Sequence, residues 1–251
     1  MDRAAKEARV YGIFQEISEG YDRANTRISL GLHRGWKQML TGRLTESLPA
    51  GAEMLDVCCG TGDVALEVAG KRRDVRVTGL DFSPAMLEAA ERRRKGLPNV
   101  RFLQGNALEL PAEDGRFAAA CVSFGLRNTA DFARGLEELK RVVRPGGWVY
   151  CLDSFVPEGR LVRPFYRFYF RRVMPRLGGG RKHAASYRWL YDSTEQFLRR
   201  GELAELFRTV GLEDIRSSCR MFGACALVWG RVPGEKRHQQ YKEEPYERGK
   251  I

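Results

Sequence analysis

Short apolar segments alternate with helical patterns through the middle of the chain, and this alternation limits the fold more than any other feature. Between the apolar segments, residues such as Phe132, Leu136 and Leu139 recur at helical spacing. Strands that alternate with helices form a parallel sheet covered on both faces. We predict such an α/β sheet, with strands near Glu53–Val57, Val75–Leu80, Val100–Gln104, Phe117–Ser123 and Gly147–Leu152.

The segments on either side of this sheet complete the domain plan. Residues 1–48 precede the first strand, and we expect a helical extension that forms a lid. A helix ending at Gly211 and two strands, near Leu212–Arg220 and Ala224–Arg231, would complete the sheet as a hairpin. The polar, charged residues 232–251 are expected to be a disordered tail. We expect residues 49–231 to form one ligand-binding domain.

Composition favours a cytoplasmic protein. The chain has 251 residues, of which 43% are hydrophobic and 30% charged, which suits one domain with a sizeable core. No apolar run reaches the roughly 18 residues that span a bilayer, and the N-terminus begins with charged residues rather than an apolar signal segment. The six cysteines contain no CxxC pair, so we expect buried, reduced thiols and no metal site.

The net charge of +11 favours an anionic partner: nucleic acid, an acidic membrane surface or an anionic substrate. A surface that only keeps the protein in solution is the alternative. In the predicted helix over Arg160–Val173, four arginines share one side and apolar residues take the other, namely Leu161, Phe165, Phe168, Tyr169 and Val173. Such a helix suits anionic lipid, unless it packs on the sheet with a solvated arginine face.

The strongest single motif follows the first predicted strand, where residues 55–63 read Leu-Asp-Val-Cys-Cys-Gly-Thr-Gly-Asp. Gly60 and Gly62 allow a tight turn and a close approach of the backbone to a ligand. Cys58 replaces the first glycine of the GxGxxG dinucleotide fingerprint, and the Lys-Ser/Thr pair of a phosphate-binding loop is missing. The loop therefore suits a zwitterionic amino-acid tail better than a pyrophosphate.

Two polar residues follow the next strands in the expected order. Asp81 ends the second strand, where a carboxylate would hydrogen-bond both hydroxyls of a ribose. Asn106, followed by Ala107, lies just past the third strand, where it would meet an adenine ring. Each feature alone is common, but together at strand ends they indicate an adenosyl cofactor.

Further motifs resemble the ubiquinone/menaquinone biosynthesis C-methyltransferase family, within the class I S-adenosylmethionine methyltransferases. The likeness runs from about residue 11 to residue 231. Its N-terminal signature lies in Tyr21–Asn25, Ser29 and Gly31–Trp36, and its fourth-strand signature is Ser123-Phe124-Gly125-Leu126-Arg127-Asn128. Arg141–Gly147 and Tyr187–Leu190 follow in order.

The resemblance implies a Rossmann-like class I methyltransferase fold with S-adenosylmethionine as cofactor. The implied reaction is C-methylation of a reduced prenylated quinone precursor, demethylmenaquinol or a related quinol. The expected cofactor-binding residues are Tyr21, Asp56, Gly60, Thr61, Gly62, Asp81, Phe82, Asn106, Ala107 and Ser123. The sequence departs from the family pattern at Ala24, Asp153, Phe155 and Val228, which affects the identity of the quinone rather than the cofactor.

Methylation of a quinol carbon needs a ring hydroxyl to lose its proton, although free phenols ionise near pH 10. Arg127, at the end of the fourth strand, would stabilise the ring oxyanion, and Asn128 would hold the same oxygen. His33 is the candidate base, because its ordinary pKa lies near neutral pH. A structural salt bridge for Arg127 and a packing role for His33 are the alternatives. Asp153 would orient a substrate hydroxyl or cap a turn.

Other functions remain open from the sequence. A methyltransferase of the same fold acting on another phenolic or polyketide-like molecule is one. A nucleic-acid methyltransferase is less favoured, because Ser123–Leu126 replaces the Asn/Asp-Pro-Pro-aromatic motif and no RNA-binding module is present. A non-catalytic cofactor-binding protein is disfavoured by the intact loop. We expect a lipid-soluble quinol as substrate, peripheral contact with the inner face of an anionic membrane, and a homodimer as one option.

Overall fold

The computed structural model describes residues 3–17, 21–174 and 184–234. Its centre is a seven-stranded sheet in the order β3-β2-β1-β4-β5-β7-β6. The strands are β1 (Glu53–Val57), β2 (Arg76–Asp81), β3 (Val100–Gln104), β4 (Phe117–Ser123), β5 (Val143–Ser154), β6 (Glu213–Arg220) and β7 (Cys225–Arg231). Only β7 runs antiparallel to its neighbours, β5 and β6. The predicted mainly parallel sheet with a final hairpin is confirmed.

Helices cover both faces of this sheet because strand residues alternate between two buried clusters. Leu55 packs with α6 and α10, whereas the adjacent Met54 packs with α3 and α4. The helices are α1 (Arg3–Ile17), α2 (Tyr21–Ile28), α3 (Leu32–Ser47), α4 (Asp63–Lys71), α5 (Pro84–Arg93), α6 (Phe132–Val142), α7 (Val162–Phe168), α9 (Ala184–Gln196) and α10 (Arg200–Thr209). The helical N-terminal extension predicted from the sequence is present as α1, α2 and α3.

Local sequence signals explain where elements begin. The Ser83 hydroxyl accepts a hydrogen bond from the Met86 amide, and Pro84 occupies the first turn of α5, a pairing of residues that is typical of a helix start. The fifth strand begins at Val143, earlier than the predicted start near Gly147, so that it includes Pro145 and Gly146. These residues lie inside β5 as an irregularity, since the register with β4 shifts between Phe117 and Ala119.

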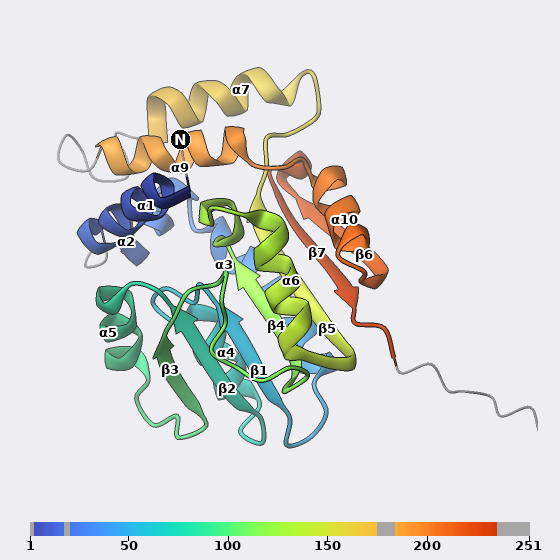
Figure 1. The fold of residues 1–251 in the computed structure, drawn as a ribbon. Coiled ribbons are helices and arrows are strands. Elements are labelled where there is room, and N and C mark those ends of the chain that lie inside the picture. The colour runs from blue at the N-terminus through green and yellow to red at the C-terminus, as the bar shows by residue number, and fades with distance from the viewer. Residues whose placement is uncertain (1–2, 18–20, 175–183, 235–251) are drawn as a thin grey trace, which may run out of the picture.

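Four helices gather over the carboxyl ends of the parallel strands: α1, α2, α7 and α9 (Figure 1). The segment predicted as one helix over Arg160–Val173 is α7 followed by a π-helical turn, Tyr169–Val173. Ligands of open parallel sheets bind at this edge. The fold therefore brings helices that are far apart in the sequence together around one edge of the sheet.

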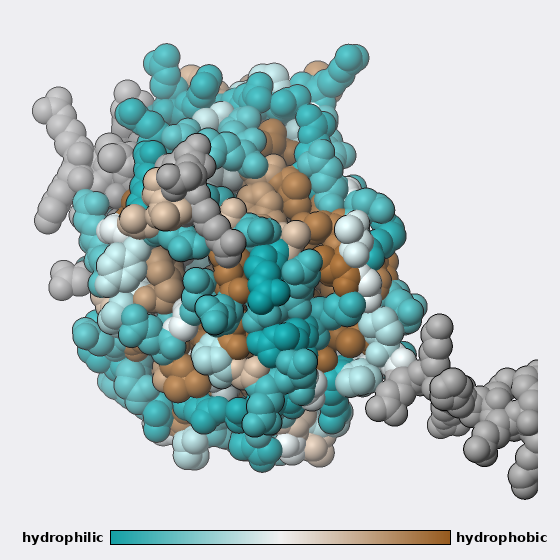
Figure 2. Space-filling model, in the orientation of Figure 1, coloured by the Kyte–Doolittle hydropathy of each residue, from teal (hydrophilic) through white to brown (hydrophobic). Residues whose placement is uncertain are grey.

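The surface and the C-terminal end refine the sequence predictions. Hydrophilic side chains cover most of the face in Figure 2, with hydrophobic ones showing between them. Val232, placed in the expected tail, is buried and its amide donates to the Gly147 carbonyl, while residues 235–251 lie outside the described residues. Cys219 is exposed rather than buried, because it lies on the edge strand β6. Among the described helices, none is long and apolar enough to cross a bilayer.

Candidate active site

The glycine loop links β1 to α4 by a tight, left-handed turn. Gly60 and Gly62 have φ values of 55° and 81°, which favour glycine. The Cys59 amide donates to the Leu80 carbonyl at 3.0 Å, so the loop is tied to the end of β2. At Gly62 a Cβ atom would lie 2.8 Å from the Phe102 ring. Gly62 thus serves the turn and its packing, whereas the loop residues from Cys58 to Thr61 line a cavity.

Asp81 is buried at the end of β2 and anchors two neighbouring segments. Its carboxylate accepts the Gly60 amide at 2.8 Å and the Ser83 amide at 3.0 Å. Burial raises the pKa of Asp81, and these backbone donors oppose that rise. A carboxylate has about four lone-pair sites. Asp81 therefore retains acceptor sites for a ligand while it holds the loop in place.

A first cavity, the Asp81 cavity, has a volume of about 140 Å³. Helix α1 helps to line it through Glu7 and Val10, and the Tyr11 ring meets Phe82 edge-on at 5.7 Å between centroids. The predicted cofactor residues Asp81, Phe82, Asn106 and Ala107 all line this cavity, as does Asn128. The structure therefore brings together side chains that follow three different strands.

A second cavity, the apolar cavity, is larger, at about 450 Å³. Most of its wall is aromatic or aliphatic, from α2, α3, α7 and the turn between β6 and β7. Its polar lining includes four predicted site residues, His33, Thr61, Ser123 and Arg127. Cys58 lines both cavities, so the two spaces meet beside the glycine loop.

The residues around Cys58 fit an adenosyl amino acid. The Asp81 carboxylate faces the smaller cavity with acceptor sites to spare, and a Cβ on Gly60 would meet nothing within 4 Å. The Ser123 hydroxyl is buried in the apolar cavity and has no hydrogen-bond partner among the described residues. Such an unpaired polar atom suits a ligand contact. Asp81, Asn106 and Phe82 would hold the adenosine part, and Gly60 and Ser123 the amino-acid part.

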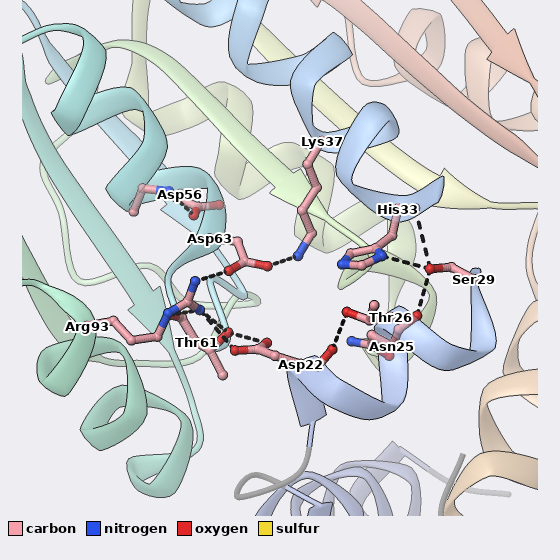
Figure 3. A network of polar contacts seen from close by, with 11 residues as sticks. Asp22, Asn25, Thr26, Ser29, His33, Lys37, Asp56, Thr61, Asp63 and Arg93 are labelled. Carbon is pink, nitrogen blue, oxygen red and sulfur yellow. Dashed lines mark hydrogen bonds and ion pairs between the residues drawn. The ribbon is translucent and has the colours of Figure 1, made fainter. Parts of the chain in front are cut away.

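A polar network joins the N-terminal helices to the glycine loop (Figure 3). The Thr61 hydroxyl donates to the Asp22 carboxylate at 2.9 Å and accepts from Arg93 at 2.8 Å. Asp63 pairs with both Arg93 and Lys37 at 2.5 Å. Burial would raise the pKa of Asp63, but the two cations outweigh it and lower the pKa to about 2. This network fastens α2 and α3 over the loop.

Several members of this network were not predicted as site residues, namely Lys37, Asp63 and Arg93. Lys37 lies four residues after His33 and so shares its helix face, which is the signal that could have identified it. Tyr21 was predicted to bind the cofactor, but its side chain is not among those that the structure describes. Its neighbour Asp22 makes the contacts to the loop.

His33 lies half-buried on α3 at the apolar cavity. The Ser29 hydroxyl lies 2.7 Å from His33 Nδ1 and donates its only proton to the Asn25 carbonyl, also at 2.7 Å. His33 Nδ1 must therefore donate to Ser29, which leaves Nε2 as the acceptor. Burial lowers the pKa of His33, and the nearby Lys37 charge lowers it further. The imidazole is therefore neutral near pH 7 and able to accept a proton.

Arg127 and Asp153 form a buried ion pair beneath the apolar cavity. Their exposed side-chain fractions are 7% and 0%. Asp153 also accepts the Arg127 and Ser154 amides, at 3.3 and 2.8 Å, and Arg127 donates to the Phe124 carbonyl at 3.0 Å. The structure thus shows the salt bridge that was the structural alternative for Arg127. Arg127 also lines the apolar cavity, so its pairing with Asp153 holds the guanidinium charge in place at the cavity wall.

Besides Gly62, two predicted site residues lie elsewhere than expected. Asn128 lines the Asp81 cavity rather than the apolar one, and its side-chain oxygen accepts from Trp189 at 3.3 Å. Asp56, expected to bind the cofactor, is buried within the sheet and lines neither cavity. Its carboxylate instead accepts the Ala65 amide at 3.1 Å, which holds the start of α4. Its burial raises its pKa to about 7.

Comparisons with known proteins agree with this geometry. A methyltransferase from Thermotoga maritima has a TM-score of 0.63 at 20% identity, covering 88% of this chain and 99% of that one. A Haemonchus contortus phosphoethanolamine N-methyltransferase in complex with S-adenosylmethionine has a TM-score of 0.59 at 16% identity, covering 79% of this chain and 52% of that one. These likenesses concern the fold.

Sequence comparison is more specific. The demethylmenaquinone methyltransferase of Geobacillus stearothermophilus is 40% identical over 232 residues, 91% of this chain and 98% of that protein. The model of the ubiE/COQ5 methyltransferase family matches residues 2–232. The fold and the glycine loop define a class I methyltransferase that uses S-adenosylmethionine. The chain belongs to the ubiE/COQ5 methyltransferase family, which confirms the resemblance drawn from its motifs.

Proposed function

We propose that the chain methylates a ring carbon of a reduced, prenylated demethylquinone, demethylmenaquinol or a related quinol. The observation that carries this proposal is the apolar cavity of about 450 Å³ that meets the Asp81 cavity at Cys58. A flat ring with an apolar tail suits a wall with so few polar groups. The name of the Geobacillus relative, demethylmenaquinone methyltransferase, supports the same substrate class.

The side chains at the apolar cavity suit this reaction. Bound S-adenosylmethionine supplies an electrophilic methyl group on a positively charged sulfur. His33 Nε2 would accept the proton of a ring hydroxyl, and the Arg127 charge would stabilise the oxyanion left behind. The ring carbon would then take the methyl group as its bond to sulfur breaks. The methylated carbon would lose its own proton to solvent, which restores the aromatic ring, and His33 would return its proton to the ring oxygen. The apolar wall would exclude water from the reacting ring carbon. In this proposal Asn128 lies on the cofactor side and does not hold the ring oxygen.

A labelling experiment tests the substrate class. The protein is incubated with methyl-labelled S-adenosylmethionine and separate samples of demethylmenaquinol, a benzoquinol analogue, a simple phenol and tRNA. We expect label in the quinols, with the fully methylated menaquinol as the control that lacks a reactive ring carbon. Label only in the simple phenol or only in tRNA would contradict the proposal. The two quinols also decide between a naphthoquinone and a benzoquinone ring.

We further propose that this otherwise cytoplasmic protein contacts the anionic inner face of a membrane reversibly. Five exposed apolar side chains line the apolar cavity and form a rim around its opening, here called the apolar rim: Leu30, Leu32, Phe165, Met221 and Phe222. Exposed arginines border the rim in the sequence, at Arg34 and Arg220. In addition, the Phe168 side chain on α7 is exposed, and Leu161, the residue before α7, is 84% exposed. Exposed apolar and basic side chains suit an anionic bilayer.

Vesicle sedimentation tests this membrane contact. We expect the protein to sediment with vesicles rich in anionic lipid at low salt, and less with zwitterionic ones. The double variant Phe165→Ser with Phe222→Ser should partition at least tenfold more weakly, since burial of one such ring is worth about 1.5–3 kcal/mol. Leu103→Ser, at an exposed apolar residue of β3, is the matched control. Equal sedimentation of both variants would exclude the rim as the contact.

A further inference from the structure

The apolar cavity holds a second buried hydroxyl group that lacks a partner. The Tyr166 hydroxyl, like that of Ser123, is fully buried and makes no hydrogen bond within the described part of the chain. Native proteins pair nearly all buried polar groups, so an exception calls for an explanation such as a ligand. Ser123 is predicted to contact the cofactor, whereas Tyr166 has no predicted role.

Tyr166 is held firmly in the cavity wall. It is 8% exposed, although Phe165, the residue before it on α7, is 77% exposed. Its ring stacks on Phe170, with 4.2 Å between centroids. The stacking and the burial restrict the ring to one orientation, so the position of its hydroxyl is fixed before a substrate enters.

The surroundings keep this hydroxyl protonated. Burial raises the pKa of Tyr166 well above its ordinary value, against the opposing charge of Arg127. Glu195 and Asp153 raise the pKa further. A phenol that stays protonated at every working pH donates a hydrogen bond and does not act as a base. Its proximity to Arg127 places a neutral donor and a cation at one wall of the cavity.

We propose that the Tyr166 hydroxyl donates a hydrogen bond to a ring oxygen of the quinol and stabilises the oxyanion formed there with Arg127. This inference rests on the proposed function and adds a substrate-contacting catalytic residue to it. A donor fixed in advance costs no reorganisation when charge develops. The proton that leaves the ring oxygen goes to the base, and Tyr166 keeps its own proton throughout.

The test is Tyr166→Phe, with Tyr150→Phe as the matched control. Both tyrosines are buried, but Tyr150 lines neither cavity, and its hydroxyl already donates to Ser47 Oγ at 3.0 Å. We expect Tyr166→Phe to lower kcat/KM for demethylmenaquinol on the order of 100-fold. Its melting temperature should stay the same or rise, because an unpaired buried hydroxyl is removed. Tyr150→Phe should show the reverse: a lower melting temperature, because the hydrogen bond to Ser47 is lost, and little change in turnover.

A binding measurement without cofactor separates this inference from the proposed function. Cofactor-free protein is titrated with 1-naphthol, an unreactive phenol, and we expect about fivefold weaker binding by Tyr166→Phe than by the unaltered chain. Activity of Tyr166→Phe within twofold of the unaltered chain, or equal naphthol binding by both, overturns the inference. Failure of the unaltered chain to label any quinol would instead overturn the proposed function, while the naphthol result still stands by itself.

Discussion

Asp153→Ala should lower the free energy of unfolding by about 3–5 kcal/mol, because it leaves the buried Arg127 guanidinium without its carboxylate. Two backbone amides, those of Arg127 and Ser154, lose their acceptor at the same time. Such a loss is a large part of the roughly 5–15 kcal/mol that stabilises a typical domain. Denaturant unfolding followed by circular dichroism measures the change.

Asp114→Ala is the matched control for Asp153→Ala. Asp114 also pairs with an arginine, Arg141, but its side chain is 79% exposed. Exposed ion pairs contribute about 0–1 kcal/mol, so this variant should unfold almost as the unaltered chain does. Equal, small effects of both variants would show that the Arg127–Asp153 pair does not stabilise the fold as its burial indicates.

Replacing both members of the buried pair separates the structural role of Arg127 from its proposed chemical role. The double variant Arg127→Met with Asp153→Leu removes both charges together, and such replacements are often neutral or stabilising. We expect stability to recover only in part, because the Arg127 and Ser154 amides still lack their acceptor, and turnover to stay low, with cofactor affinity little changed. Recovered turnover would mean that Arg127 only holds the loop after β4.

The strands and the glycine loop could be predicted because their signals are local. Apolar runs, the Ser83-Pro84 helix start and the glycines at positions 60 and 62 each act within a few residues. Asp81 could be placed because the carboxyl ends of parallel strands share one edge. Its hold on the Gly60 amide, across 21 residues of sequence, follows from the same adjacency of β1 and β2.

The pairings among these residues depend on strand order and helix packing, which no local signal records. Arg127 and Asp153 were both singled out in the sequence, but their ion pair follows from the register of β4 and β5, in which Ser123 lies opposite Leu152. Asp56 was expected to bind the cofactor because it belongs to a local motif. It precedes the glycine loop in a ligand-binding motif, yet the alternation of side chains along β1 places it on the same face as Met54, where it holds the start of α4.

His33→Gln should lower kcat by about 100- to 10,000-fold, the range typical of a lost general base. Glutamine retains hydrogen-bonding ability but cannot accept the substrate proton. With the unaltered chain, kcat should fall as the pH drops through the lowered pKa of His33, below its ordinary value near 6.5, because protonated His33 is not a base. In His33→Gln this acid limb should disappear. His238→Gln, outside the described residues, controls for the loss of a histidine.

Lys37→Met provides the sharper test of the same base, since it alters His33 without touching it. Lys37 lowers the pKa of His33, whereas Asp63, now relieved of its lysine partner, raises it. Both changes act in one direction, so the acid limb of the pH profile should move to higher pH, with less activity near pH 6 and little change above pH 8. A limb that stays in place, or a profile of His33→Gln that matches the unaltered chain, would assign the proton transfer to another group. Because the charge of Lys37 repels the protonated imidazolium through space, high salt should weaken the difference between the two profiles only in part, as expected for partly buried charges.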